Sequence, residues 1–148
     1  MKKQSFKIAE RAPTLKEFTL LNKAVGWDRY TNLNAIPQAL ANSLFCVVAT
    51  VGRQTVGMGR LVGDGARFVY VQDLVVLPEF QHLGVGTAMM DRLMQFIDER
   101  VPRKAYVHLF TQKATSAFYA RYGFKGPEES FYGMSVKKFD APLQRSAK

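Results

Sequence analysis

The 148-residue sequence has one cysteine and no long apolar run. A lone cysteine cannot form an internal disulfide, and Cys46 stands inside the apolar stretch 44–49, so we expect a small core residue rather than a nucleophile. A membrane span needs about 20 apolar residues, and a signal peptide needs a shorter apolar run, and the chain has neither. We therefore expect a cytoplasmic protein.

Low-complexity segments and repeats of fixed period are also absent. Apolar residues make up 47% of the chain and charged residues 22%, which is typical of globular proteins rather than disordered ones. A chain of this length can bury a core without disulfides or metals. We therefore expect a single domain over residues 1–148.

Acidic residues are too few to balance the basic ones, which leaves a formal net charge of +9 at pH 7. The basic residues gather at the two ends, with seven in residues 1–31 and ten in residues 100–148, of 21 in all. Such a charge attracts polyanions, including nucleic acid, a membrane surface or a phosphorylated cofactor. No nucleic-acid-binding motif accompanies the charge, so we expect no nucleic-acid partner and no membrane partner.

Capping and turn signals divide the first forty residues. Thr14 and Glu17 have the spacing of a capping box, which predicts the start of a helix, and Gly26 predicts its end. Pro37 falls inside a second helical pattern. The predicted elements are a strand over 4–9 and helical segments over 14–25 and 32–41.

From Leu44 onward the period changes to that of strands. Turn signals at Gly52-Arg53 and at 63–65 separate three strand-like runs, which predicts an antiparallel meander. Apolar residues then recur at helical spacing from Val85 to Ile97, and Pro102 ends that helix. The predicted elements are strands over 45–51, 55–62 and 67–77, a helix of about four turns, a strand over 105–110, a short helix over 116–122 and a last strand over 132–139.

Two glycines precede the long helix, at Gly84 and Gly86. Backbone N–H groups at a helix start are unpaired, and glycine lets an anion approach closely, so this turn predicts a phosphate site. A P-loop is disfavoured because no lysine follows Gly86, and the features of a dinucleotide fold are missing, including the third glycine where Met89 stands. Six residues separate the strand from the glycines, so the predicted turn is wide and wraps an anion beside the strand's end.

The turn reads Gln-His-Leu-Gly-Val-Gly over residues 81–86 and resembles the Gln/Arg-x-x-Gly-x-Gly/Ala signature of the GNAT superfamily of N-acetyltransferases. Farther on, residues 118–124 resemble the family's second signature, Phe-Tyr-x-x-x-Gly-Phe. The resemblance covers roughly residues 45–139. It implies an α/β (α+β) fold with a mixed, mostly antiparallel sheet of six to seven strands that splays after the fourth strand, flanked by about four helices.

The resemblance also implies acetyl-CoA as co-substrate and no metal. The amides of residues 82–87 would hold the pyrophosphate, and the pantetheine arm would pair with the backbone of the preceding strand, which demands little of its side chains. Gln81 stands where many relatives have arginine, and Gln112 where many have asparagine. The predicted cofactor-binding residues are Leu74, Val75, Val76, Gln81, His82, Leu83, Gly84, Val85, Gly86, Thr87 and Gln112.

Two residues are candidate catalysts by the same resemblance. An alkyl ammonium has a pKa of about 10.4, so forming the free amine at pH 7 costs roughly 4 to 5 kcal/mol and calls for a base. Asp73 matches an acid that relatives often place on this strand, although in some relatives the base is a glutamate where Gln72 stands here. The alternative is that Asp73 pairs with a neighbouring arginine or a backbone amide. Tyr119 matches the tyrosine that protonates the CoA thiolate in many relatives, and Tyr122 lies three residues beyond it.

The sequence does not identify the acceptor amine. Trp27, Tyr30 and Phe131 are candidate walls of its pocket, and His82 and His108 lie too far apart in sequence, without a carboxylate cluster, to predict a metal site. We expect acetyl transfer to a small-molecule primary amine by direct attack in a ternary complex. The alternatives are an acetyl-CoA-binding sensor with little turnover and a protein lysine or N-terminal acetyltransferase. Dimers are frequent in the superfamily, so a homodimer stays open.

Overall fold

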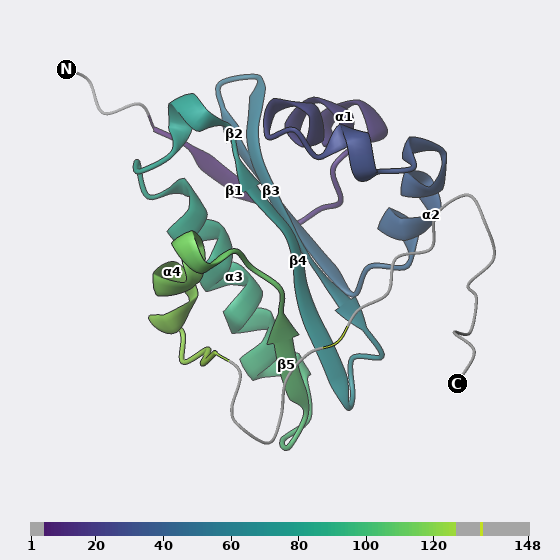
Figure 1. Ribbon diagram of the computed structural model, residues 1–148, viewed down its shortest axis with the longest axis vertical. Helices are drawn as coiled ribbons and strands as arrows, with labels where there is room; N and C mark the ends of the chain where they lie inside the picture. The colour runs from purple at the N-terminus through teal and green to yellow at the C-terminus, as the bar shows by residue number, and fades with distance from the viewer. Residues whose placement is uncertain (1–4, 127–133, 135–148) are drawn as a thin grey trace, which may run out of the picture. The chain divides into compact units, whose positions relative to one another are not determined.

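The computed structural model describes residues 5–126 and residue 134 (Figure 1). The chain divides into two compact units, Met1–Phe110 and Thr111–Lys148, and each is described by itself. The predicted last strand over 132–139 and the pocket candidate Phe131 lie outside the described residues.

The first unit is built on a five-stranded sheet whose strands lie side by side in chain order. Neighbouring strands among the first four are antiparallel, and the fifth runs parallel to the fourth. The predicted meander is therefore confirmed, and the described residues hold five of the six to seven strands expected for the whole chain. The strands are β1 (Lys7–Ala9), β2 (Phe45–Val51), β3 (Gln54–Gly63), β4 (Phe68–Val76) and β5 (Tyr106–Leu109).

Helix α1 (Leu15–Ala24) begins at the predicted capping box. The Glu17 amide donates to Thr14 Oγ1 at 3.2 Å, and the Thr14 amide donates to Glu17 Oε2 at 2.7 Å, so two otherwise unpaired N–H groups are satisfied. The helix ends before Gly26, whose φ of 76° is a left-handed conformation that glycine adopts at little cost. Phe18 and Leu21 are buried.

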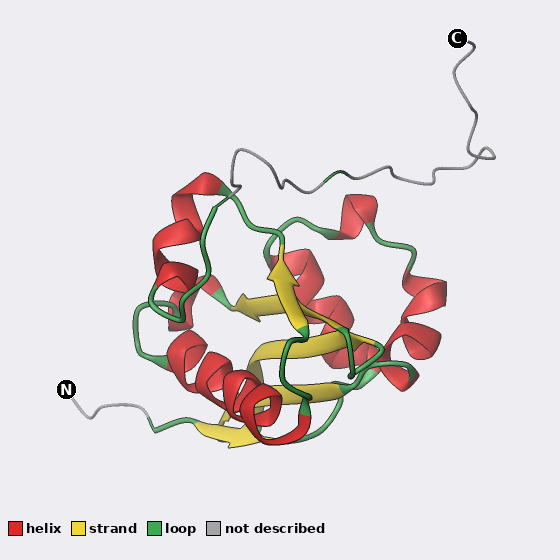
Figure 2. Ribbon diagram, turned by 90° about the horizontal axis from the view of Figure 1, so that it is seen from below, coloured by secondary structure: helices red, strands yellow, loops and turns green. Residues whose placement is uncertain are grey.

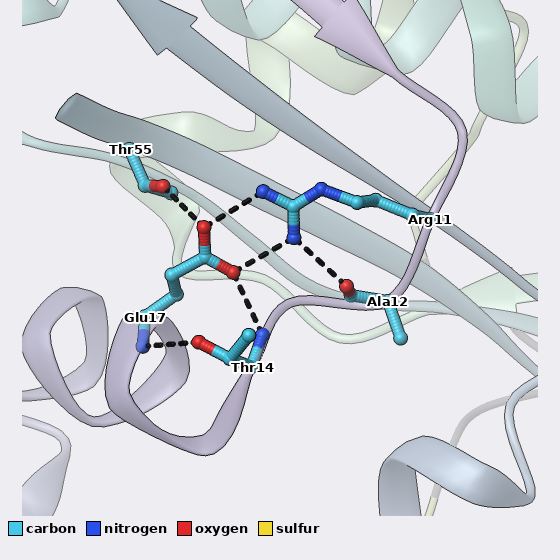
Figure 3. A network of polar contacts seen from close by, with 5 residues as sticks. All are labelled: Arg11, Ala12, Thr14, Glu17 and Thr55. Carbon is cyan, nitrogen blue, oxygen red and sulfur yellow. Dashed lines mark hydrogen bonds and ion pairs between the residues drawn. The ribbon is translucent and has the colours of Figure 1, made fainter. Parts of the chain in front are cut away.

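Glu17 also ties the start of α1 to the sheet (Figure 3). Both of its oxygens accept from the Arg11 guanidinium, at 2.8 and 2.7 Å, and Oε1 accepts from the Thr55 hydroxyl of β3 at 2.6 Å. Arg11 also donates to the carbonyl of Ala12 at 3.1 Å. The carboxylate therefore joins the loop after β1, the helix and the sheet.

The predicted helical segment over 32–41 is two elements in the structure. A turn of 3₁₀ helix, η2 (Leu33–Ala35), leads into the short helix α2 (Ile36–Ala41). Pro37 falls in the first turn of α2, where its missing N–H has no hydrogen bond to lose. Another 3₁₀ turn, η1 (Asp28–Tyr30), carries Tyr30 and follows Trp27.

Helix α3 (Val85–Arg100) packs on the face of the sheet opposite α1 and α2, as Figures 1 and 2 show. Two glycines of β3 make this close packing possible: a Cβ on Gly57 would lie 2.9 Å from Met89 Cε, and one on Gly59 would lie 3.2 Å from Leu93 Cδ1. Cys46 is buried in the core, as predicted, and burial raises the pKa of its thiol. The helix buries Val85, Met89, Met90 and Leu93.

The described part of the second unit holds a 3₁₀ turn, η4 (Lys113–Thr115), and helix α4 (Ser116–Ala120). The helix is two residues shorter than the predicted segment over 116–122. Gly123 follows it with a φ of 86°, in agreement with its predicted role as the residue that ends the helix.

Candidate active site

Strand β4 changes its hydrogen-bonding partners half-way along. From Val69 to Val71 it has β3 on one side and β5 on the other, but β5 ends at Leu109, opposite Val71. Over residues 72–76, β3 is therefore the only strand paired with β4 within the described chain. A free strand edge is a template on which an extended ligand can add hydrogen bonds. This is the splay after the fourth strand that the resemblance implied.

A β-bulge marks the same place. On β3 the register moves two residues, from Met58 to Arg60, while on β4 it moves three, from Val75 to Gln72. The extra residue belongs to β4, and Asp73 there has a φ of 51°, an uncommon value for a residue other than glycine. The extra residue shifts the alternation of side chains by one. Even-numbered residues before the bulge and odd-numbered residues after it therefore point to the same face of the sheet.

The Asp73 side chain forms an ion pair with Arg60 of β3. The distance from Arg60 Nε to Asp73 Oδ2 is 2.5 Å, and the same guanidinium donates through Nη1 to Ser43 Oγ at 3.2 Å and to the Ala39 carbonyl at 3.3 Å. The pairing with an arginine, which the sequence left open as an alternative, is therefore present. The role of Asp73 as a base stays a prediction. A small hollow here is lined by Pro13, Met58, Gly59, Arg60 and Asp73.

The turn between β4 and α3 contains the predicted phosphate site. A 3₁₀ turn, η3 (Pro78–Phe80), follows β4, and both His82 and Gly84 have left-handed backbones, with φ of 61° and 86°. Among the residues that the structure describes, no side chain caps α3, and its first turn contains no acidic residue. Since the start of a helix carries partial positive charge and outward N–H groups, this arrangement favours an anion.

Gln81 is bound within this turn. Its side-chain Nε2 donates to the carbonyl of Val76, at the end of β4, at 3.0 Å. The amide therefore fixes the turn to the strand, and the predicted contact between Gln81 and the pyrophosphate stays a prediction. Val85 is buried, whereas Leu83 is 51% exposed. The structure brings all the predicted cofactor residues from 74 to 87 together in one unit.

Tyr119 and Gln112 belong to the second unit. Tyr119 is half-buried, and its ring meets Phe118 and Phe124 edge-on, with centroids 5.0 and 6.3 Å apart. Burial raises the pKa of the Tyr119 phenol above its ordinary value of 10.0, and the phenol is protonated at neutral pH with or without that shift. Gln112 is exposed directly before η4, and its carbonyl accepts from the Thr115 amide at 3.0 Å. The roles of both residues stay predictions.

Other candidates lie at the surface of the first unit. Trp27 is 38% exposed and Tyr30 is 67% exposed, and their place in an acceptor pocket stays a prediction. No three His, Cys, Asp or Glu side chains among the residues described here are grouped as a metal would require. Within the same residues, no helix is both long and apolar enough to cross a bilayer.

Two features of this region were missed by the sequence reasoning. Arg60 was not identified as the partner of Asp73, because the pairing depends on the strand register and on the bulge. Gly57 and Gly59, two residues apart inside a predicted strand, were the available signal, since glycine within a strand often marks a bulge or a close approach. His108 was considered only as a metal ligand, although it alternates with Tyr106 on a predicted strand.

Comparison with known proteins decides the family. The family description "Acetyltransferase (GNAT) domain" matches residues 42–126 of the chain. The chain belongs to the GNAT family of acetyltransferases. The matched GNAT segment starts before β2 and includes β4, the glycine turn, α3 and Tyr119, so it contains every predicted catalytic and cofactor-binding residue.

Curated relatives are similar over part of their length. The GCN5-related N-acetyltransferase 1, chloroplastic, of Arabidopsis thaliana is 33% identical over 82 residues, which is 55% of this chain and 41% of that protein. The serotonin N-acetyltransferase 2, chloroplastic, of Oryza sativa subsp. japonica is 30% identical over 92 residues, which is 62% of this chain and 45% of that protein. The aligned part of the chain therefore spans less than half the length of either relative.

Two solved structures are similar to the chain over their whole length. A GNAT-family acetyltransferase from Streptococcus pneumoniae is 31% identical, with a TM-score of 0.75, and the similarity covers 93% of this chain and all of that one. A protein of unknown function from meticillin-resistant Staphylococcus aureus, described as a probable acetyltransferase, is 27% identical, with a TM-score of 0.83, over 90% of this chain and all of that one. The predicted GNAT fold is thus confirmed.

Proposed function

We propose that this GNAT-family chain transfers an acetyl group from acetyl-CoA to the primary amine of a small molecule, and that its two units work as one acetyltransferase domain over residues 1–148. The observation that carries the proposal is the order of two features: the edge of β4 that is free among the described residues is followed, after the turn over residues 77–84, by the start of α3. The family match over residues 42–126 supports one domain, because it runs across the boundary between the units.

The residues present suit the parts of acetyl-CoA. The backbone of Leu74, Val75 and Val76 offers hydrogen bonds to the amides of the pantetheine arm, and the turn over residues 82–87 offers N–H groups to the pyrophosphate. An arm laid along this edge would bring the thioester to the point where β4 and β5 part, beside the bulge at Asp73.

The chain's own groups would then serve the transfer. The amine nitrogen forms a bond to the thioester carbonyl carbon, and a backbone N–H near Val75 stabilises the negative charge on the carbonyl oxygen. As the C–S bond breaks, the Tyr119 phenol protonates the leaving thiolate and regains a proton from the newly bonded nitrogen. A base is needed beforehand, to remove the first proton from the ammonium.

The acceptor is proposed to be a small amine, which the name of the rice relative, a serotonin N-acetyltransferase, supports. A protein lysine is the second candidate, because a Glycine max relative named histone acetyltransferase TAP1 is 28% identical over 123 residues, covering 74% of this chain. An acetyl-CoA sensor would bind the cofactor without turnover. A single set of measurements separates these three functions.

The test is calorimetric titration with acetyl-CoA and CoA, followed by a thiol-release assay with aryl-alkyl amines, polyamines, amino sugars, amino acids and a lysine-rich peptide. We expect binding of both ligands and thiol release with one class of small amine. Release with the peptide alone would make the protein-lysine candidate correct, and binding without release would make the sensor correct. Absence of binding would overturn the proposal.

A matched pair of glycine variants tests the place of binding. Gly84→Ala adds a methyl group in the predicted phosphate turn, at a φ of 86°, and should weaken CoA binding by about tenfold or more. Gly52→Ala adds the same group at a φ of 57° in the β2–β3 turn, also with open space around it, and should leave binding unchanged. Equal effects of the two variants would point to general backbone strain.

Tyr119→Phe tests the proton donor. The variant keeps the ring contacts with Phe118 and Phe124 but loses the hydroxyl, so turnover should fall about 10²- to 10⁴-fold while CoA affinity in the calorimeter stays the same. If affinity falls together with turnover, Tyr119 contributes to packing rather than to proton transfer.

A further inference from the structure

The place where β4 and β5 separate has a histidine beside it. The last paired residues are Val71 and Leu109, and the pair immediately before them is Tyr70 and His108. A strand advances about 3.3 Å per residue, so His108 lies within one or two residue steps of the separation point. If acetyl-CoA binds as proposed above, on which this inference rests, the thioester comes to the same point.

His108 projects to the same face of the sheet as Arg60 and Asp73. The Arg60 guanidinium of β3 donates hydrogen bonds to the Ala39 carbonyl of α2 and to the Ser43 hydroxyl just after it. Arg60 therefore lies on the face of the sheet that α2 covers. Side chains two residues apart on a strand share a face, and residues paired across strands share it too. Val62 shares that face with Arg60 and pairs with Tyr70, which pairs with His108. The imidazole therefore lies opposite α3, on the face covered by α1 and α2.

Neighbouring rings fix the position of the imidazole. It stacks on Tyr106 with centroids 5.9 Å apart and planes within 11°, and it lies 5.5 Å from the ring of Tyr70. Phe68 continues the row, stacked on Tyr106 at 5.7 Å, with the Arg67 guanidinium 5.4 Å from its centroid. His108 is only partly buried, so a ligand or water can reach the ring.

The other candidate base is less suited to the task. Asp73 shares this face, but its carboxylate accepts a 2.5 Å hydrogen bond from Arg60, and that guanidinium is itself fixed to Ser43 and to the chain at Ala39. That carboxylate is already engaged in an ion pair, whereas an imidazole is the side chain that most often acts as a general base. The titratable or charged side chains on this face of β3, β4 and β5 are Arg60, Tyr70, Asp73, Tyr106 and His108.

We infer that His108 is the general base that deprotonates the acceptor ammonium. The proton moves from the ammonium nitrogen to the imidazole, either directly or through one water, and the freed lone pair forms the bond to the thioester carbon. The imidazolium then returns its proton to solvent. Asp73 is left as a positioning residue that holds Arg60 and the bulge in place.

Two substitutions at the same position test the assignment. His108→Gln removes the basic nitrogen, and His108→Phe also keeps a flat ring between Tyr70 and Tyr106. With the amine class that the wild type acetylates, both variants should lose about 10²- to 10⁴-fold in turnover at pH 7. The loss should shrink as pH rises toward the pKa of the amine, and CoA affinity should stay at the wild-type value. Glu99→Gln, an exposed change near the end of α3, is the control.

Asp73→Asn is measured beside them over the same pH range. Retention of wild-type turnover by His108→Phe would overturn the inference and leave the ring a packing role, as would a loss that does not change with pH. A pH-dependent loss in Asp73→Asn, with little change in the His108 variants, would make Asp73 the base instead. Inactivity of the wild type with every amine would overturn the proposed function itself, which sets that failure apart from a wrong base.

Discussion

Two arginine–carboxylate pairs in the first unit differ in how many hydrogen bonds the carboxylate accepts. Glu17 accepts two from Arg11, one from the Thr14 amide and one from the Thr55 hydroxyl (Figure 3). Asp73 accepts one, from Arg60, among the described residues. Their exposed fractions are nearly equal, 19% and 21%, so burial does not separate them.

The number of donors decides what each carboxylate can do. Hydrogen bonds to the charged form stabilise it, and those from Arg11 do most to lower the pKa of Glu17 to about 2. Glu17 is therefore a structural junction that stays ionised at every physiological pH. Asp73 keeps capacity for further hydrogen bonds, beside the hollow that it lines with Pro13. We expect changes at Glu17 to affect stability and changes at Asp73 to affect the site.

Glu17→Ala should give the largest effect on stability. The variant leaves the Thr14 amide and the Thr55 hydroxyl without their acceptor, so the free energy of unfolding should fall by about 2 to 3 kcal/mol in urea titrations. Lys16→Ala, one residue away and exposed, should change it by less than about 0.5 kcal/mol. Similar losses in the two variants would show that the junction contributes little.

Acid should weaken the protein through the same residue. Because the folded-state pKa of Glu17, about 2, lies below its ordinary value of 4.5, the unfolded chain takes up a proton first as pH falls. The stabilisation is complete above about pH 4.5 and is lost as pH falls toward 2. Urea midpoints measured over this range should fall less steeply in Glu17→Gln than in the wild type, and parallel curves would contradict the assignment.

Asp73→Asn should destabilise less than Glu17→Ala. The charge of the acceptor is lost, but the amide oxygen can still accept a hydrogen bond from Arg60, so we expect a loss of about 1 kcal/mol in the same urea titration. Arg60→Gln gives the reciprocal measurement from the other partner. If either variant destabilises more than Glu17→Ala, the number of hydrogen bonds does not rank the two pairs.

Thr55→Val should give the smallest effect. It removes one of the four hydrogen bonds to Glu17 and keeps the shape of the side chain in β3, so the loss should be about 0.5 kcal/mol, at the lower end for a single hydrogen bond. Combined with Glu17→Ala, the substitution should add little, because its hydrogen-bond partner is already absent. Full additivity of the two losses would mean that Thr55 stabilises β3 independently of Glu17.

Features set by neighbours in sequence could be predicted from the sequence. The capping box of Thr14 and Glu17 spans one helical turn, and the glycine turn before α3 is defined by spacing along the chain, so both were predicted correctly. Arg11 and Thr55 reach Glu17 through the approach of the β1–α1 loop to β3, which no local pattern encodes. Pro37 made the boundary of the second helical segment hard to predict, because proline occurs in the first turn of a helix and also interrupts helices.

The same reason limits what the sequence can predict about the candidate site. Residues 74–87 form one continuous stretch, and the signature could place them together. The Arg60–Asp73 pair and the neighbourhood of His108 depend on how β4 aligns with β3 and β5, and a bulge changes that alignment by one residue. Strand register is fixed by the packing of the whole sheet, so a single sequence gives little information about it.

The extra residue of β4 has a consequence for how this chain can change over time. Up to Gln72, even-numbered side chains share the face of Arg60, and beyond the bulge Val75 shares it instead, while Leu74 turns toward Gly59. Side chains before and after the bulge therefore follow opposite odd–even alternation along β4. If acetyl-CoA binds as proposed above, replacing Tyr70 or Gln72 would alter the part of the strand before the bulge, and the backbone edge over residues 74–76 would keep its alignment. Acceptor preference could then change in evolution while cofactor binding stays the same.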